Sequence, residues 1–109
     1  MTNFTRGDVV WVNLDPAIGA EIKKRRPCVI MSLTATNKVR RNVVVVPLAS
    51  SGTPRPPFVV ATPSAGPTSN ARIDQVRTVD KSRIGGVVCS LSPAEMFDIR
   101  KAIVTVLGL

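Results

Sequence analysis

The chain has 109 residues, 44% of them hydrophobic and 20% charged, which allows one domain with a core and excludes the disordered class. Fifteen Lys and Arg residues against seven Asp and Glu residues give a net charge of +8, which favours an anionic partner such as nucleic acid, an acidic membrane or an acidic protein. With no histidine, two separated cysteines and scattered acids, the chain cannot build a structural zinc site alone, and we expect no metal ion and no cofactor.

Short apolar runs rich in β-branched residues, separated by Gly, Pro and Asn, predict a mainly β fold. In chain order, the predicted strands are residues 9–12, 28–31, 43–46 and 58–61, followed by weaker candidates at 71–75 and 86–89. Trp11 lies within the first strand, where side chains point to alternate faces, and it is expected in the core. The continuously apolar run 43–46 predicts a strand that is buried on both faces.

Two segments are predicted to be connections between strands. Residues 15–26 contain proline, glycine and charge but no apolar period, and a connection of this length is either disordered or functional. Six of the nine prolines lie between Pro47 and Pro67, so residues 50–57 and 63–68 are predicted to be loops.

Only the C-terminal segment has a helical pattern. Residues 92–95 form a capping box with proline at the first helical position, and Gly108 ends the helix. One apolar face recurs at helical spacing, formed by Met96, Ile99, Ile103, Val106 and Leu107. Short strands and one terminal helix predict a small, strongly curved barrel in a single domain, residues 1–109.

The sequence predicts a cytoplasmic protein. Its first eight residues are polar, unlike a secretory signal, and no apolar run approaches the ~20 residues of a membrane-spanning helix. In a reducing compartment, Cys28 and Cys89 are expected to be free, buried thiols.

Three stretches spread over the chain resemble the MazF/PemK toxin family. The first comprises residues 6–12, 14–16, 19–21 and 26–30, the second residues 45–50, and the third residues 74–83. The resemblance implies an SH3-like β-barrel with a C-terminal α-helix and a homodimer. It also implies a toxin of a type II toxin–antitoxin system that cleaves single-stranded RNA sequence-selectively without a metal ion and is neutralised by an acidic antitoxin.

Cleavage of this kind uses the 2′-OH of the RNA as nucleophile and leaves a 2′,3′-cyclic phosphate and a 5′-hydroxyl. It needs a base, a proton donor and cations for the phosphorane charge. Arg26 matches the arginine of the family's Arg-Pro motif, which is held to be catalytic. Because a guanidinium has a pKa above ~12, we expect transition-state stabilisation more than acid catalysis. The alternative is an arginine that caps a strand edge in solvent.

The second candidate pair is Arg72 and Asp74. On an extended strand, residues two apart share a face, and some family members have an Arg-x-Asp here with the aspartate assigned as base and the arginine as acid. The competing interpretation is a surface ion pair of little energetic value.

Ser50 follows Ala49, where many relatives carry threonine, so the serine either supplies the phosphate-binding hydroxyl or is an ordinary loop residue. Ala20 replaces a histidine of some relatives, which shifts the role of base towards Asp74. We expect further RNA contacts from polar and basic residues along the predicted site: Glu21, Lys23, Lys24, Arg25, Ser51 and Arg77. With only 4% aromatic residues, stacking of bases is poorly supported.

Two other functions stay open. One is a poison of DNA gyrase, since a related toxin family resembles this fold, although the chain lacks a tryptophan near its C-terminus. The other is a non-catalytic barrel that binds RNA or an acidic peptide, which Ala49 keeps possible.

Overall fold

The protein is built on one antiparallel sheet with a long helix against it. A computed structural model describes residues 4–16, 19 and 24–109. Within these residues the strands are β1 (Asp8–Asn13), β2 (Arg25–Ile30), β3 (Asn42–Ala49), β4 (Val59–Ala61), β5 (Asn70–Arg72), β6 (Arg77–Asp80) and β7 (Ile84–Ser90). The α-helices are α1 (Thr34–Val39) and α2 (Pro93–Leu107), and the 3₁₀ helices are η1 (Pro63–Ala65), η2 (Ile73–Gln75) and η3 (Lys81–Arg83).

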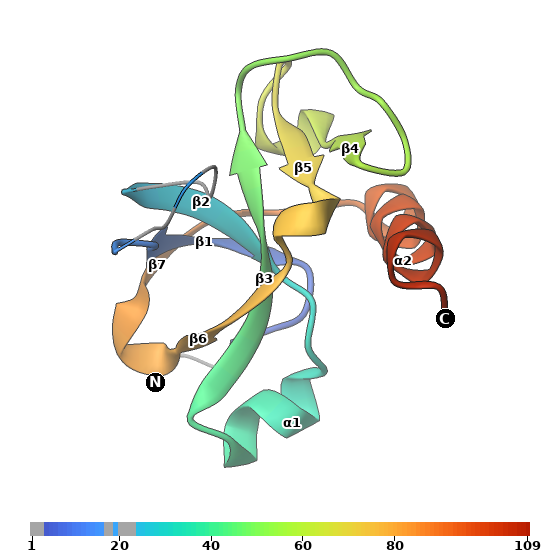
Figure 1. The fold of residues 1–109 in the computed structure, drawn as a ribbon. Helices are drawn as coiled ribbons and strands as arrows, with labels where there is room; N and C mark the ends of the chain where they lie inside the picture. The colour runs from blue at the N-terminus through green and yellow to red at the C-terminus, as the bar shows by residue number, and fades with distance from the viewer. Residues whose placement is uncertain (1–3, 17–18, 20–23) are drawn as a thin grey trace.

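The strands follow the order β4-β5-β3-β2-β1-β7, and β6 pairs with the first half of β3. The sheet curves strongly, so that β1, β2, β3, β6 and β7 surround one interior (Figure 1). It is barrel-like but not closed, because the path runs from β4 to β7 without returning. The predicted mainly β architecture with a C-terminal helix is confirmed.

Alternation along the strands creates two buried clusters. We call the first side of the sheet the barrel face; its cluster consists of Val10, Val12, Leu14, Cys28, Ile30, Val43, Val45 and Val79. We call the other side the helix face, because its cluster packs on α2; it includes Val9, Val29, Val46, Leu48, Ala71, Ile73, Ile99 and Ala102. Both clusters contain residues of the run 43–46, which confirms that this strand is buried on both faces.

Helix α2 begins and ends where the sequence predicts. The Ser92 hydroxyl accepts a hydrogen bond from the Glu95 amide at 3.2 Å, and the Glu95 carboxylate accepts one from the Ser92 amide at 2.7 Å. Gly108 closes the helix in the left-handed conformation, with φ of 70°. Within the described residues, no helix is long and apolar enough to span a membrane.

Several sequence expectations are wrong. The strand expected at 71–75 ends at Arg72, and Cys89, expected to be buried, is only partly buried. Helix α1 was not predicted, because its sequence TATNKV has no apolar period. The side-chain amide of the buried Asn37 stabilises this helix by donating a hydrogen bond to the Phe4 carbonyl at 2.6 Å. The short strand β6 was missed as well. Arg25 and Arg26 belong to β2, not to the connection before it. Trp11 is 36% exposed, not in the core.

Candidate functional site

Arg26 lies on the barrel face at the start of β2. Side chains two apart on a strand share a face, so Arg26 lies on the same side as the buried Cys28, and it pairs with the buried Val12 of β1. Its position follows from β1–β2 pairing, which continues five residue pairs out to Asn13 and Arg25. Arg26 is exposed beyond the buried part of the strand.

A second arginine lies on the barrel face in β6. Arg77 pairs with Val45 of β3, and it lies two residues before Val79 on the barrel face. Burial raises the pKa of the Cys28 thiol to about 12, and the positive charge of Arg77 is close enough to oppose this rise. Arg26 and Arg77 therefore flank the buried thiol from two different strands.

The third arginine, Arg72, holds a loop. Its Nη2 donates a hydrogen bond to the Ser51 carbonyl at 2.5 Å. The side-chain amide of Asn70 donates to the Ser51 and Gly52 carbonyls at 3.3 and 3.0 Å. Gly52 has φ of +88°, and a Cβ there would lie 3.1 Å from Arg72 Nη2. Glycine is therefore needed at this position both for its conformation and for the close approach of the guanidinium.

Strand pairing brings Arg72 to the barrel-face side. Leu48 pairs with Ala71, both in the helix-face cluster, so Arg72 points the other way, as Arg26 does. The Arg72 Nε is buried and has no hydrogen-bond partner in the described part of the chain. Three guanidiniums, from β2, β5 and β6, thus lie on one side of the sheet.

The sequence spacing predicted that Asp74 and Arg72 share a strand face. The structure shows that they do not. Strand β5 ends at Arg72 and the chain turns into η2, where Ile73 is buried and Asp74 is exposed. Arg41 and Asp80 form the one ion pair among the described residues. Arg72 and Asp74 therefore do not form the surface ion pair that was the alternative interpretation, and the carboxylate of Asp74 is open to solvent.

The hydroxyl candidates lie at the end of β3. Ala49 is the last residue of that strand, and Ser50 and Ser51 after it are exposed. Cys28 pairs with Pro47 in the antiparallel β2–β3 register. Arg26 precedes Cys28 by two residues and Ala49 follows Pro47 by two, so this register places Ala49 on the same side of the sheet as Arg26. A threonine in place of Ala49 would point its hydroxyl to this side of the sheet.

The base of the β1–β2 connection is fixed by several hydrogen bonds. The Lys24 amide donates to the Asp15 carboxylate at 2.8 Å, and the Leu14 amide donates to the Lys24 carbonyl at 2.9 Å. Arg83 donates to the Asn13 carbonyl at 3.1 Å and also to the Asp15 carbonyl. Sequence reasoning missed this role of Arg83, although the third family-like stretch ends on it. Lys24 is exposed, while Glu21 and Lys23 lie outside the described residues.

Arg25 lies apart from the three barrel-face arginines. As the neighbour of Arg26 on a strand, it points to the opposite face, where its guanidinium carbon lies 5.0 Å from the centroid of the Trp11 ring. Arg25 and Arg26 therefore do not belong to a single cluster.

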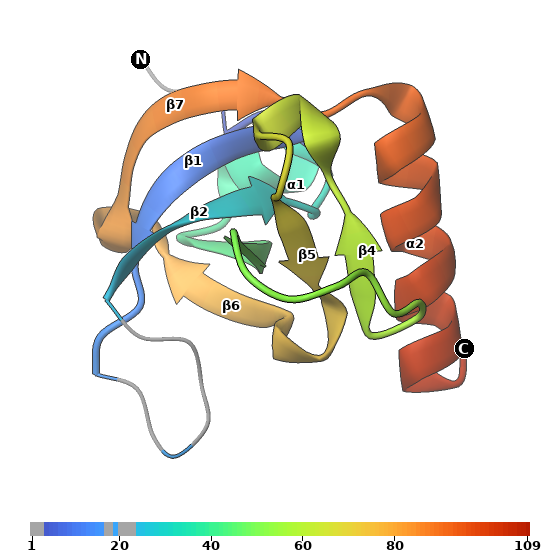
Figure 2. The ribbon, with the colours of Figure 1, turned by 90° about the horizontal axis from the view of Figure 1, so that it is seen from above.

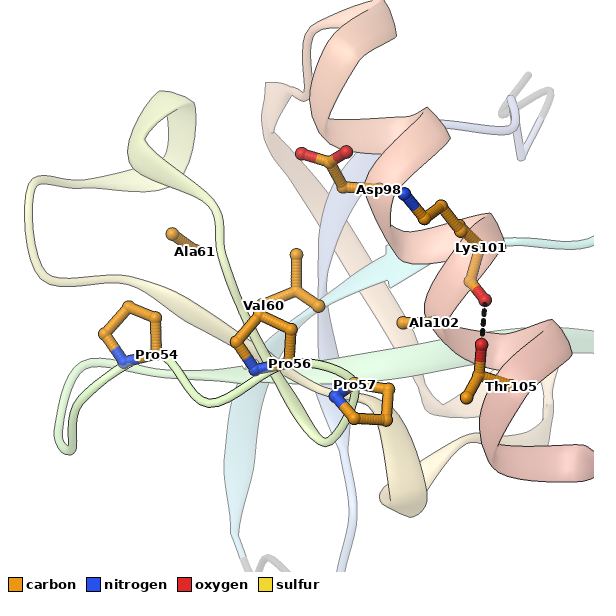
Figure 3. Close-up of a pocket in the computed structure, with 9 residues that line it drawn as sticks. All are labelled: Pro54, Pro56, Pro57, Val60, Ala61, Asp98, Lys101, Ala102 and Thr105. Carbon is orange, nitrogen blue, oxygen red and sulfur yellow. Dashed lines mark hydrogen bonds between the residues drawn. The ribbon is translucent and has the colours of Figure 1, made fainter.

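A cavity of about 370 Å³ lies elsewhere, between the proline-rich loop and α2 (Figure 3). Pro54, Pro56 and Pro57 face Asp98, Lys101 and Thr105 across it. None of the described site candidates lines this cavity. The site is therefore defined by charge and strand register, and not by the cavity.

The barrel-face arginines suit a phosphodiester. Guanidiniums donate several N–H groups to phosphate oxygens in fixed geometry, and no acid in the described residues forms an ion pair with Arg72 or Arg77. The described part of the chain also holds no group of three or more His, Cys, Asp and Glu residues that could bind a metal ion.

Comparison with known proteins finds similarity along nearly the whole chain. Residues 5–107 match the family of PemK-like, MazF-like toxins of type II toxin–antitoxin systems. The chain is 37% identical over 89 residues to endoribonuclease PemK of Escherichia coli, covering 78% of this chain and 67% of that protein. It is 31% identical over 107 residues to endoribonuclease MazF9 of Mycobacterium tuberculosis, covering 90% and 91%.

Solved structures of the same family are similar to this chain in fold. The crystal structure of MazF from Deinococcus radiodurans is similar with a TM-score of 0.86 at 27% identity, over 96% of both chains. An endoribonuclease from a mycobacterial species, solved in complex with its cognate antitoxin, is similar with a TM-score of 0.79 at 30% identity, over 96% of this chain and 95% of that one.

Proposed function

Since the chain belongs to the family of PemK-like, MazF-like toxins, we propose that it is the toxin of a type II toxin–antitoxin system and an endoribonuclease that cleaves single-stranded RNA. The relatives named as endoribonucleases support this activity. The observation that carries the proposal is the placement of Arg26, Arg72 and Arg77 on one side of the sheet. In this proposal residues 1–109 form one toxin domain, which acts in the cytoplasm.

The reaction proceeds by attack of the 2′-OH on the adjacent phosphorus. Asp74 accepts the 2′-OH proton, the O2′–P bond forms, and the P–O5′ bond breaks to give a 2′,3′-cyclic phosphate and a 5′-hydroxyl. The leaving 5′-oxygen takes its proton from water, because a guanidinium is too weak an acid at neutral pH. The exposed carboxylate of Asp74 supports its role as base, since it is committed to no ion pair with a described residue.

The arginines stabilise the charge that develops on the phosphorane. Arg26 and Arg77 donate to the non-bridging oxygens, which is the type of electrostatic stabilisation that contributes most to such reactions. In some relatives the arginine at this position is assigned as the general acid. Here Arg72 has a positioning role instead, because its hydrogen bond to the Ser51 carbonyl fixes the loop that carries the hydroxyl of Ser50. Ser50 in turn donates to a phosphate oxygen.

Two partners follow from the family. A mycobacterial relative was solved with its cognate antitoxin, and the net charge of +8 suits an acidic antitoxin segment. The protein forms a homodimer. Exposed apolar side chains on α2 support this, because Phe97 is 58% and Leu107 is 54% exposed, and light scattering after gel filtration would measure the mass.

The test is cleavage of a long transcript in EDTA, with the termini mapped by mass spectrometry. We expect 2′,3′-cyclic phosphate and 5′-hydroxyl ends. Arg26→Ala is expected to lower the rate by about 10² or more, and Asp74→Asn by about 10²-fold or more. Arg40→Ala is the matched control, because Arg40 is exposed at the end of α1, far from β5 (Figure 1).

Intact RNA after prolonged incubation with the wild-type protein would refute the proposal. Retained binding of RNA without the cyclic product would identify a non-catalytic module. Equal loss of rate in Arg26→Ala and Arg40→Ala would show that net charge, and not the barrel-face site, determines the activity.

A further inference from the structure

The outer end of the β1–β2 pair carries an exposed tryptophan that the cleavage mechanism does not use. Trp11 lies on the same side of β1 as Val9, two residues earlier, and α2 covers Val9 but does not reach Trp11. Figure 2 shows why: the end of β1 and the start of β2 lie on the opposite side of the molecule from α2. A large aromatic ring is therefore left 36% exposed.

Arg25 lies over this ring. Its guanidinium carbon is 5.0 Å from the ring centroid, a distance at which the cation is attracted to the π face. Arg25 pairs with Asn13 at the last position of the β1–β2 ladder and is itself exposed. The guanidinium and the indole therefore form an exposed cation–π pair at this edge of the sheet.

Strand β7 keeps the space beside this pair open. The β1–β7 register shifts between Val9 and Val10 and again between Val10 and Val12, and Gly85 and Gly86 follow Ile84 at the second irregularity. A Cβ at Gly85 would lie 3.2 Å from Arg25 Nη2 and 3.4 Å from Trp11 Cβ, whereas a Cβ at Gly86 would meet no described atom within 4 Å. Gly85 therefore leaves room for the guanidinium to lie against the ring.

We propose that Arg25, supported by Trp11, stacks an unpaired nucleobase of the bound RNA. Proteins hold single-stranded bases on aromatic rings and on guanidinium planes, and a cation on this platform suits RNA better than an apolar peptide. The inference rests on the proposed function and deepens it. It assigns Arg25 to the binding of a base, which makes specific the general RNA contact expected from the sequence.

The platform is within reach of the cleavage site. Arg25 and Arg26 are adjacent in sequence and point to opposite faces of β2, and the β2–β3 ladder begins only at Cys28. At this end, then, β2 pairs with β1 but not with β3 among the described pairs. A single RNA strand that passes over this edge can place a phosphate beside Arg26 and a neighbouring base on Arg25.

Trp11 is the only tryptophan in the sequence, so its fluorescence reports directly on the platform. The probe is a pool of seven-residue 2′-O-methyl oligoribonucleotides of randomised sequence, in which the attacking hydroxyl is blocked. The comparison probe is an abasic oligomer with the same number of phosphates. We expect the pool to quench Trp11 fluorescence and the abasic oligomer to leave it nearly unchanged, although both bind.

Three variants test the geometry. Arg25→Lys keeps the charge but loses the plane, and we expect it to bind the pool about tenfold more weakly while its affinity for the abasic oligomer is unchanged. Gly85→Ala should weaken binding of the pool by a similar factor because its Cβ displaces the guanidinium, while the matched control Gly86→Ala should bind as the wild type does. Thermal unfolding of both alanine variants verifies that they fold.

Equal quenching by the pool and the abasic oligomer would overturn the inference, and so would wild-type binding of the pool by Arg25→Lys. Quenching by an acidic peptide with an aromatic residue, but not by the pool, would identify a protein-binding surface instead. Cleavage of a long transcript is measured separately. A wild-type protein that cleaves RNA without base-dependent quenching refutes this inference alone, whereas base-dependent quenching without cleavage refutes the proposed nuclease activity alone.

Discussion

Glu95 connects helix α2 to the β4–β5 segment, and its replacement gives a measurable test of the structure. One carboxylate oxygen accepts from the Ser92 amide at 2.7 Å, and the other accepts from the Ser64 amide in η1 at 2.9 Å. The residue is only 7% exposed. In Glu95→Gln a single amide oxygen remains, so the new NH₂ group faces one of the two backbone donors.

The magnitude follows from these two bonds. A hydrogen bond to a charged group contributes about 1.5–3 kcal/mol. We therefore expect Glu95→Gln to lower the free energy of unfolding by about 3 kcal/mol at pH 7. For a domain of about 100 residues, 1 kcal/mol corresponds to roughly 4 °C or more in Tm, so the melting temperature should fall by at least about 12 °C.

The loss also depends on pH. Burial alone would raise the pKa of the Glu95 carboxyl, but the hydrogen bonds from Ser64 and Ser92 outweigh it and hold the pKa below the ordinary value of 4.5. A carboxylate with a lowered pKa stabilises the fold fully above its unfolded-state pKa, and this contribution is lost as the pH falls through the folded-state value. The difference between wild type and Glu95→Gln should therefore be constant near neutral pH and shrink below about pH 4.5.

Urea unfolding followed by circular dichroism between pH 3 and 7 measures this difference. Asp98→Asn is the control, because Asp98 is an exposed acid on the same helix; it should stay within about 0.5 kcal/mol of the wild type. A Glu95→Gln protein as stable as the wild type at pH 7, or a difference that persists unchanged at pH 3, would refute the reasoning.

Three further predictions concern the site and its supports. Ala49→Thr should raise the cleavage rate, measured on the same transcript, because it adds a hydroxyl on the side of Arg26; an unchanged rate would mean that this position does not contact the phosphate. Arg83→Ala should lower the free energy of unfolding by about 1–2 kcal/mol, since it removes donors to two carbonyls at the base of the β1–β2 connection; denaturant unfolding would contradict this if the midpoint did not move. A thiol reagent should leave Cys28 unmodified in the native protein, because it is buried with a pKa raised to about 12, and should modify the partly buried Cys89 slowly; two fast thiols per native chain would show that the barrel face is open.

Several elements of the fold could be predicted because their signals are local. The apolar runs became β1 to β4 with small changes at their ends, since a β-branched run between turn residues has few other stable conformations. Helix α2 was predicted to its last turn, because the capping box at Ser92 and the left-handed Gly108 are short-range features. The family, too, was evident from three stretches of sequence, and the comparison over residues 5–107 confirms it.

Other elements depend on contacts between distant residues. Helix α1 is polar and forms around the buried Asn37, whose partner Phe4 lies 33 residues away. Strand β6 has only four residues and exists because β3 offers it an edge. The extended spacing expected for Arg72 and Asp74 failed because burial of Ile73 turns the chain into a 3₁₀ helix.

The sequence by itself determined the residue types of the site: arginines, one carboxylate, hydroxyls and no histidine. Only the tertiary structure decided which of them share a face. Pairing with β1 extends β2 through Arg25 and Arg26 and sends the two neighbours to opposite sides, one with Arg72 and Arg77 and the other onto Trp11. Adjacency in the chain cannot reveal this separation, because strand alternation divides neighbours while sheet register brings together residues far apart in sequence.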